Sequence, residues 1–154
     1  MATRLSDHFT LEELCKSQTA ERHHLNNVPS DPEIVENLRA VCEKILEPVR
    51  ANFGKPFSPS SGYRSPKLNK LVNGSKSSQH LRGEAADFEV PGVANFDLAT
   101  WIEQNLPFDQ LILEFYEPGK PNSGWVHCSL KRQGANRGET LTINKDGRKP
   151  GLIR

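Results

Sequence analysis

The segment ILEFYEPGKPNSGWVHCSL contains two runs of alternating apolar and polar residues on either side of a loop rich in proline and glycine, residues 118–123. This pattern predicts an antiparallel β-hairpin. If Glu117 pairs with Gly124, then Glu114 lies opposite His127, and opposed side chains project from the same face of a sheet. The predicted polar face carries Ile112, Glu114, His127 and Ser129, and the predicted apolar face carries Leu113, Phe115, Val126 and Cys128. The hairpin therefore predicts a sheet with one face packed on a core and the other turned toward a cleft.

Most of the sequence before this hairpin is patterned for helices. The longest pattern runs from Ser30 to Gly54, with apolar residues every three or four positions. Pro48 is predicted to kink or end this helix about a turn early. Thr10, followed three residues later by Glu13, predicts a short helix that begins with a capping box. Two further helices are predicted at residues 65–74 and 95–107, with Ser65 and Asn95 as their N-cap residues.

The order of these elements predicts a single α+β domain over residues 1–154, with a small, mainly antiparallel sheet packed with helices. The tail, residues 139–154, predicts one edge strand and a turn at Asp146-Gly147. A chain of 154 residues buries enough surface to fold without a disulfide or a structural metal. Its 20 basic and 19 acidic residues give a net charge of +1, which argues against a general attraction to nucleic acid or to a membrane surface. We expect a monomer.

Cysteine placement and the N-terminus indicate the compartment of synthesis. Cys15, Cys42 and Cys128 lie far apart and form no C-x-x-C pair. The N-terminal residues lack the apolar core of a secretory signal, and no apolar run approaches the roughly 20 residues of a membrane span. We therefore expect free thiols and synthesis in a reducing cytoplasm, so that action outside the cell would require release by another agent.

The segment SSQHLRGEAADFEV places a histidine and an aspartate seven residues apart around a glycine. Gly83 allows a tight turn after His80, and the alternation that follows puts Asp87 on the polar face of a strand, beside the small Ala85. With His127 of the hairpin, these residues form a set of two imidazoles and one carboxylate, which holds catalytic zinc with its fourth position open to water. Taken alone, each residue would more often be a solvated or structural group, and the combination is what predicts a zinc site.

At these residues the sequence resembles the M15 zinc peptidases. Their signature S-x-H-x-x-G-x-A-x-D is reproduced by Ser78, His80, Gly83, Ala85 and Asp87. The segment WVH, residues 125–127, is similar to the one that supplies their third ligand. The resemblance extends from about Ser61 to Leu130 and implies the α+β fold of the hedgehog and D,D-peptidase group. Members of this family cut the peptide stems of bacterial cell walls, as D,D-carboxypeptidases, dipeptidases or phage endolysins.

The resemblance implies zinc ligands at His80, Asp87 and His127, with Arg64 contacting a carbonyl or carboxylate of the substrate. It also implies that Ser78 supports the site or the substrate. Several relatives place the catalytic acid three residues before the last histidine, where this sequence has a glycine, residue 124. The hairpin pairing favours Glu114 as the general base instead.

Glu117, nearer the loop, is the second candidate for the base. The sequence thus predicts a zinc-dependent peptidase of peptidoglycan stem peptides, similar in length and lack of a signal to a single-domain phage endolysin that acts on the wall after release. A D,D-carboxypeptidase or dipeptidase of wall recycling is an alternative. A non-catalytic binding module is another, because hedgehog signalling domains resemble this fold and keep a similar zinc site. The carboxylate predicted opposite the last ligand favours the enzyme.

Overall fold

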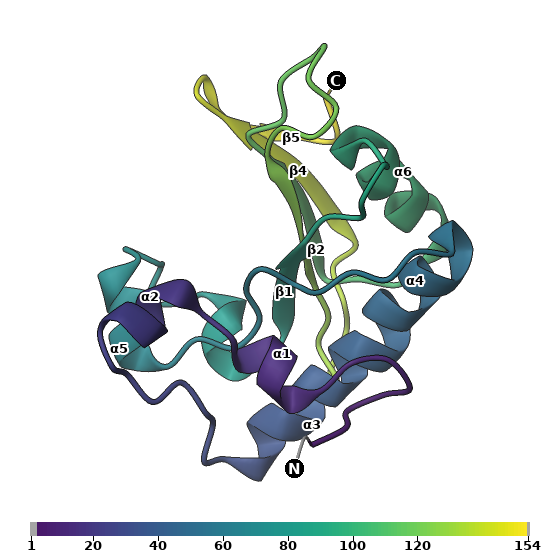
Figure 1. Cartoon of the computed structure of the whole chain (residues 1–154). Coiled ribbons are helices and arrows are strands. Elements are labelled where there is room, and N and C mark those ends of the chain that lie inside the picture. Colours follow the sequence, from purple (N-terminus) through teal and green to yellow (C-terminus); the bar gives the residue numbers. More distant parts are fainter. Residues whose placement is uncertain (1–2, 154) are drawn as a thin grey trace.

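A computed structural model describes residues 3–153, and these form one five-stranded sheet with helices packed against it (Figure 1). The helices are α1 (Leu11–Cys15), α2 (Gln18–Arg22), α3 (Pro32–Val41), α4 (Glu47–Phe53), α5 (Pro66–Leu71) and α6 (Asn95–Asn105), with a π-helical turn η1 (Cys42–Leu46) and a 3-10 turn η2 (Gln79–Arg82). The strands are β1 (Ala85–Phe88), β2 (Gln110–Glu114), β3 (Trp125–Ser129), β4 (Glu139–Asn144) and β5 (Gly147–Pro150).

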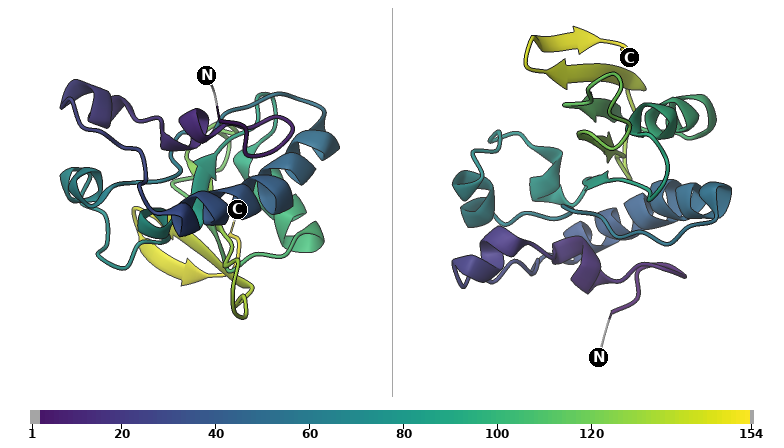
Figure 2. Two further views of the ribbon diagram at one scale, coloured as in Figure 1. Left: turned by 90° about the horizontal axis from the view of Figure 1, so that it is seen from below. Right: turned by 45° about the horizontal axis from the view of Figure 1, so that its top comes forward.

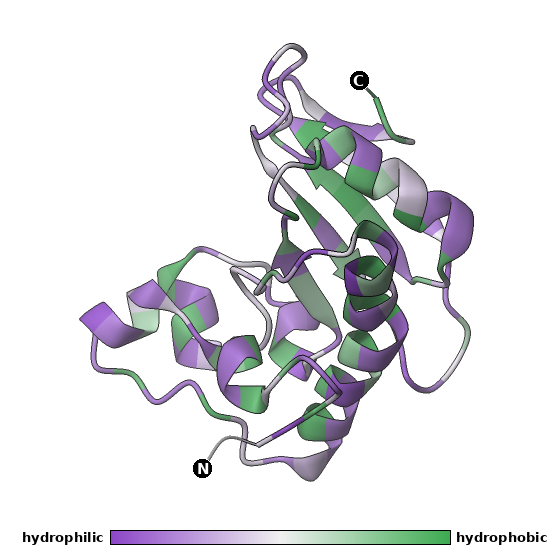
Figure 3. Ribbon diagram, turned by 45° about the vertical axis from the view of Figure 1, so that its right-hand side comes forward, coloured by the Kyte–Doolittle hydropathy of each residue, from purple (hydrophilic) through white to green (hydrophobic). Residues whose placement is uncertain are grey.

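The sheet has the strand order β1-β3-β2-β4-β5. Every neighbouring pair is antiparallel except β2 with β4, which confirms the predicted α+β class with a mainly antiparallel sheet. Helices α3, α4 and α6 cover one face, while α1, α2 and α5 gather beyond the β1 edge (Figure 1). Apolar residues concentrate on the strands and on the helix surfaces next to them, where the core lies (Figure 3).

The long helical segment is continuous from α3 through η1 to α4. Of the two predicted effects of Pro48, a kink or an early end, the early end is therefore wrong. The backbone N–H of Glu47 bonds to the carbonyl of Cys42, which widens the turn just before the proline. The wider turn accommodates the ring of a residue that has no N–H to donate, and Val49 beyond it is fully buried. The helix ends as predicted at Gly54, which has a φ of 65°.

Two shorter helices begin as the sequence predicts. Thr10 and Glu13 form the capping box of α1, and Ser65 caps α5. Helix α6 differs slightly, because Ala94 is its N-cap residue and Asn95, predicted to be the cap, is its first residue. The Asn95 side chain is buried and donates hydrogen bonds to Glu89 and to the backbone before β3.

The predicted register of the β2–β3 hairpin is wrong by two residues. Ile112 lies opposite His127, and Glu114 lies opposite Trp125. Phe115 adopts a φ of 55°, which takes the chain out of the ladder and leaves this side chain 46% exposed instead of on the apolar face. Because the shift is an even number of residues, Glu114 still projects from the same face as His127.

The tail forms a two-stranded hairpin, β4 and β5, where one edge strand was predicted. β4 lies inside the sheet, parallel to β2, and only β5 forms the edge. The hairpin projects from the end of the sheet far from α1 (Figure 2, right). β5 contains basic residues and Pro150, which are common on edge strands and give little strand signal in a sequence. Within residues 3–153, none of the helices has the length and apolar character needed to cross a membrane.

Candidate metal centre

Three side chains that sequence analysis singled out meet on the polar face of the sheet. Asp87 on β1 lies directly opposite His127 on β3, and His80 reaches them from η2. One donor atom from each side chain lies within 4.8 Å of the other two. All three residues are buried, so a cation held among them would be largely shielded from bulk water.

The turn that carries His80 is fixed at both ends. The Ser78 hydroxyl accepts a hydrogen bond from the backbone N–H of His80. Gly83 ends the turn with a φ of 73°, and a Cβ there would lie 2.8 Å from the carbonyl oxygen of Ile34 on α3. Only glycine lets the turn pack this close to the helix. Ser78 therefore holds the shape of the turn that positions His80, and it also lines the cleft described below.

One ring nitrogen of His80 is buried without a hydrogen-bond partner. The Nδ1 atom lies 2.6 Å from the carbonyl oxygen of Gly62, and because a carbonyl only accepts, Nδ1 carries the proton. The Nε2 atom is thus a free lone pair, 3.3 Å from Oδ1 of Asp87 but without hydrogen-bond geometry among the described residues. Two facing acceptors repel each other, and a cation between them satisfies both.

Asp87 supplies the negative charge of this group. Burial on its own would raise the pKa of its carboxyl, but the charge that His80 and His127 carry when protonated, together with their hydrogen bonds, outweighs burial and holds that pKa well below its usual range. The Nδ1 atom of His127 lies 2.9 Å from Asp87 Oδ1. Two nitrogen donors and one ionised carboxylate on a buried surface fit a divalent metal of the zinc type, with one coordination position left for water or substrate.

A cleft of about 660 Å³ opens over these three side chains. It is lined by the polar face of β2 and β3, by η2 and by several basic residues, which include Arg64, Arg82, Lys131, Arg137 and Arg148. Asp87 and Glu114 are the acidic residues that line it. We call this cavity the metal cleft.

Glu114 lies in the metal cleft on β2, and β3 separates this strand from the β1 strand of Asp87. Its Oε2 atom accepts a hydrogen bond of 2.9 Å from the indole N–H of Trp125. Burial raises the pKa of Glu114, the charge of Asp87 adds to this rise, and His127, Trp125 and Arg64 partly oppose it.

Glu117, the second candidate for the base, lies outside the metal cleft. It is exposed in the loop after β2 and forms a surface ion pair of 2.9 Å with Lys120. Nor can residue 124 provide an acid, because a Cβ on Gly124 would lie 2.0 Å from the carbonyl oxygen of Glu114. Among the described residues outside the group of His80, Asp87 and His127, Glu114 is therefore the carboxylate that lines the cleft.

Arg64 lies at the rim of the metal cleft, just before α5. Its backbone N–H donates to the carbonyl of His80, and its Nη1 atom donates to Oδ1 of Asn69 at 3.0 Å. A Cβ on Gly74 would lie 2.7 Å from Nη1, so glycine at that position leaves space for the guanidinium. Burial lowers the pKa of Arg64, while the charges of Asp87 and Glu114 raise it. Arg64 is thus partly buried and lines the same cleft as both carboxylates.

Sequence analysis missed a second buried aspartate, Asp109, which is bonded to the turn that carries His80. Its carboxylate accepts a hydrogen bond from the side chain of Gln79, the residue before His80. It also accepts four hydrogen bonds from the guanidinium and backbone of Arg137, the shortest at 2.8 and 2.9 Å. These partners lie 30 and 28 residues away in the chain, so no local spacing could have revealed them.

The comparison with protein families gives one match. The model of the family described as Peptidase M15 matches residues 7–129, which include every residue proposed above for the site. A search of curated proteins gave no match.

Proposed function

The chain belongs to the peptidase M15 family, and from this we propose that it is a zinc-dependent peptidase that hydrolyses amide bonds in the peptide stems of bacterial peptidoglycan. The observation that carries the proposal is the buried group of His80, Asp87 and His127 with its unpaired imidazole nitrogen. Peptidase activity follows from the family. The metal, the wall substrate and the residue roles are the proposed part.

In this proposal, the two imidazoles and Asp87 hold the metal. Zinc bound there would activate a water molecule as the nucleophile and polarise the scissile carbonyl. Glu114, which lines the same cleft, would accept the proton of the attacking water and return that proton to the leaving amine. Arg64 donates hydrogen bonds to a carbonyl or carboxylate oxygen of the substrate. Ser78 positions His80 through the 3-10 turn.

An endopeptidase of the phage endolysin type is favoured over a carboxypeptidase or dipeptidase by the cavities around Arg64. Arg64 lines both the metal cleft and a second groove of about 620 Å³. A substrate chain that reached past Arg64 would therefore have further room in the second groove, as cleavage within a chain requires. A carboxypeptidase needs room for only one or two residues beyond the scissile bond.

The test compares Glu114→Gln with Glu117→Gln in protein loaded with zinc. General-base assistance commonly contributes about 10²–10⁴-fold, so Glu114→Gln is expected to slow release of fragments from purified peptidoglycan by about that factor. Zinc content should stay near one per chain. Glu117→Gln is the matched control, because the same change at an exposed loop residue should leave the rate within about twofold.

Mass spectrometry of the released fragments identifies the bond that is cut. A new terminus inside the stem supports the endolysin reading, whereas release of single D-amino acids or dipeptides supports the recycling enzymes. If the zinc-loaded parent released nothing from peptidoglycan or stem peptides, the proposed function would be wrong, and a metal-containing binding module would replace it.

A further inference from the structure

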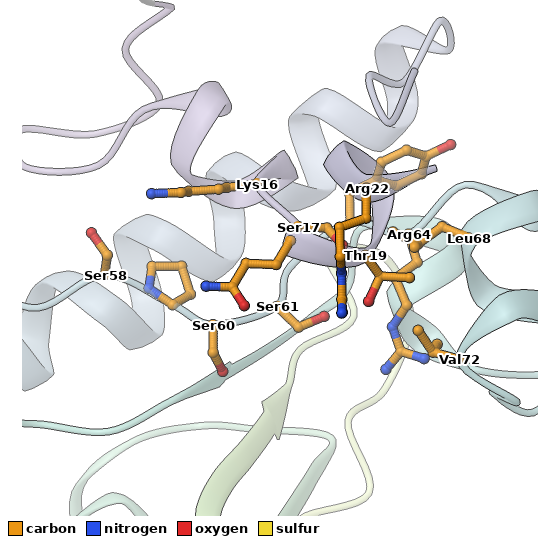
Figure 4. Close-up of a pocket in the computed structure, with 13 residues that line it drawn as sticks. Lys16, Ser17, Thr19, Arg22, Ser58, Ser60, Ser61, Arg64, Leu68 and Val72 are labelled. Carbon is orange, nitrogen blue, oxygen red and sulfur yellow. The ribbon is translucent and has the colours of Figure 1, made fainter. Parts of the chain in front are cut away.

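The second groove lies beside the metal cleft, and its walls come from three separate parts of the chain (Figure 4). It is lined by residues 16 and 17 between α1 and α2, by α2 itself, by residues 58–61, and by α5 and the residue after it. Lys16 and Ser58 lie toward one end, and Arg64 and Val72 toward the other (Figure 4). We call this cavity the basic groove.

The basic groove adjoins the candidate metal centre. Arg64 lines both cavities. Ser61, also in the groove wall, pairs with Asp87 in an antiparallel bridge, in which the Asp87 N–H donates to the Ser61 carbonyl at 2.8 Å. Part of the groove wall is therefore bonded directly to the strand that carries a candidate metal ligand.

Charge distinguishes this groove from an ordinary surface hollow. Lys16, Arg22 and Arg64 line it, and no aspartate or glutamate among the described residues does so. No ion pair within residues 3–153 involves Lys16 or Arg22. By contrast, the basic residues of the metal cleft are mostly paired, as Arg137 is with Asp109. The basic groove thus holds positive charge that the protein does not itself neutralise.

The walls of the groove are held in place by buried contacts. The Asn27 side chain donates to the carbonyl oxygens of Cys15 and Tyr63 and accepts from the N–H of Ser65, at 2.7 to 2.9 Å. Gly62 packs so closely on α1 that a Cβ there would lie 2.3 Å from the carbonyl oxygen of Leu14. These contacts join the end of α1 to the segment before α5. A bound chain therefore need not order the groove walls, which reduces the entropic cost of binding.

We propose that Lys16 and Arg22, at separate places in the groove wall, bind free carboxylates of the substrate, so that the enzyme selects anionic peptides. The inference rests on the proposed peptidase function and adds the substrate class and two specificity residues outside the metal cleft. Lysine and arginine donate charge-assisted hydrogen bonds to carboxylates, and unpaired cations beside a partly enclosed groove attract anionic chains. Neither residue contacts the reacting bond, so they act on binding and not on the chemical step.

The experiment uses synthetic wall-stem peptides in two forms, with free carboxylates and with the carboxylates converted to amides. Zinc-loaded parent is compared with the double variant Lys16→Gln/Arg22→Gln. For the free-carboxylate peptide, the double variant is expected to raise KM about tenfold with kcat nearly unchanged, since two exposed charge pairs are lost. For the amidated peptide, KM should be the same in both proteins.

The matched control is Lys44→Gln/Arg50→Gln, which removes the same two charges from residues that line neither cavity. It should change KM less than twofold for both peptides. An equal rise of KM for the two peptide forms in the groove variant, or no rise for either, would overturn the inference.

A binding measurement separates this inference from the proposed function. Fluorescence anisotropy with labelled forms of the two peptides is measured on zinc-loaded Glu114→Gln protein, with and without the Lys16→Gln/Arg22→Gln changes. Tighter binding of the free-carboxylate form, lost in the groove variant, supports the inference even if the parent cuts neither peptide. Equal affinity for the two forms contradicts it, whatever the parent hydrolyses.

Discussion

Two buried aspartates, Asp87 and Asp109, lie on either side of the turn that carries His80, and they have different kinds of partner. Asp109 faces the guanidinium of Arg137 and the amide of Gln79, so its charge is neutralised by a cation of the protein itself. Asp87 faces two imidazoles, one of which has an unpaired nitrogen. The same residue type, buried in both places, thus completes a structural ion pair at Asp109 and belongs to a set of electron-pair donors at Asp87.

This difference shows how a structural carboxylate can be told from a metal ligand. Burial and a lowered pKa are common to both residues and do not separate them. The partner of each carboxylate separates the two residues, because a guanidinium carries a permanent positive charge, whereas a neutral imidazole offers another lone pair. The comparison can be tested by changing one aspartate at a time and measuring metal content, activity and stability.

The largest effect is expected from Asp87→Ala. Two imidazoles alone leave a zinc site short of one ligand and of its negative charge, so zinc content should fall from about one per chain to a small fraction. Hydrolysis should fall by at least about 10³-fold with it. Metal analysis after dialysis and a peptidoglycan assay provide the two measurements. Full zinc occupancy in this variant would remove Asp87 from the ligand set and end the distinction between the two aspartates.

Asp109→Asn should have the opposite profile, a loss of stability with zinc retained. The change weakens the charge-assisted bonds to Arg137 and leaves buried donors poorly matched, which should lower the free energy of unfolding by about 2–3 kcal/mol. Urea unfolding of zinc-loaded protein measures this. The control is Asp7→Asn, an exposed change expected to cost less than about 0.5 kcal/mol. Loss of zinc at unchanged stability would reverse the assignment.

The acid dependence of stability sharpens the same contrast. Burial alone would raise the pKa of Asp109, but its bonds with Arg137 and Gln79 lower it from 3.8 to about 2. A carboxyl whose pKa is lowered on folding stabilises the protein above its unfolded pKa and loses this contribution as the pH falls through its folded pKa. The stability difference between parent and Asp109→Asn should therefore be constant above about pH 4 and shrink between pH 4 and 2.

Unfolding followed by circular dichroism at several pH values measures this difference. A difference that grew as the pH fell would show that the carboxylate of Asp109 does not stabilise the folded state through its charge.

The smallest effect concerns Cys128, which follows the candidate ligand His127 but points to the other face of the sheet. All three cysteines are free and buried, and burial raises the pKa of the Cys128 thiol above its usual range. Removing zinc should therefore leave thiol reactivity unchanged, with none reacting rapidly in the folded protein and three reacting after denaturation without a reductant. Titration with a chromogenic disulfide reagent counts them. One additional reactive thiol on chelation would place Cys128 in the metal group.

Local patterns predicted most of the candidate site, because its residues lie in short segments with recognisable motifs. His80 and Asp87 lie within one motif, and the strand alternation that put His127 on the polar face depends only on nearest neighbours. The register of the hairpin was not predictable in the same way. It depends on the left-handed conformation of Phe115, which an aromatic residue rarely adopts and no local signal marks.

Long-range contacts account for the rest. The pairing of Asp109 with Arg137, the wide turn before Pro48 and the place of β4 beside β2 all depend on which distant segments pack together. The fold class was predicted correctly despite these errors, because it follows from the order and periodicity of the elements. The exact neighbours of a side chain do not.

The position of β4 limits how this chain can be divided or recombined. The family match ends at residue 129, yet the cation of Asp109 and the strand beside β2 both come from later residues. A version shortened to the matched region would leave a buried carboxylate without its counter-charge and expose a new edge on β2, a strand rich in leucine and isoleucine and a template for aggregation. Chimeras that exchange the matched region between relatives should therefore include residues 130–153 from the same parent.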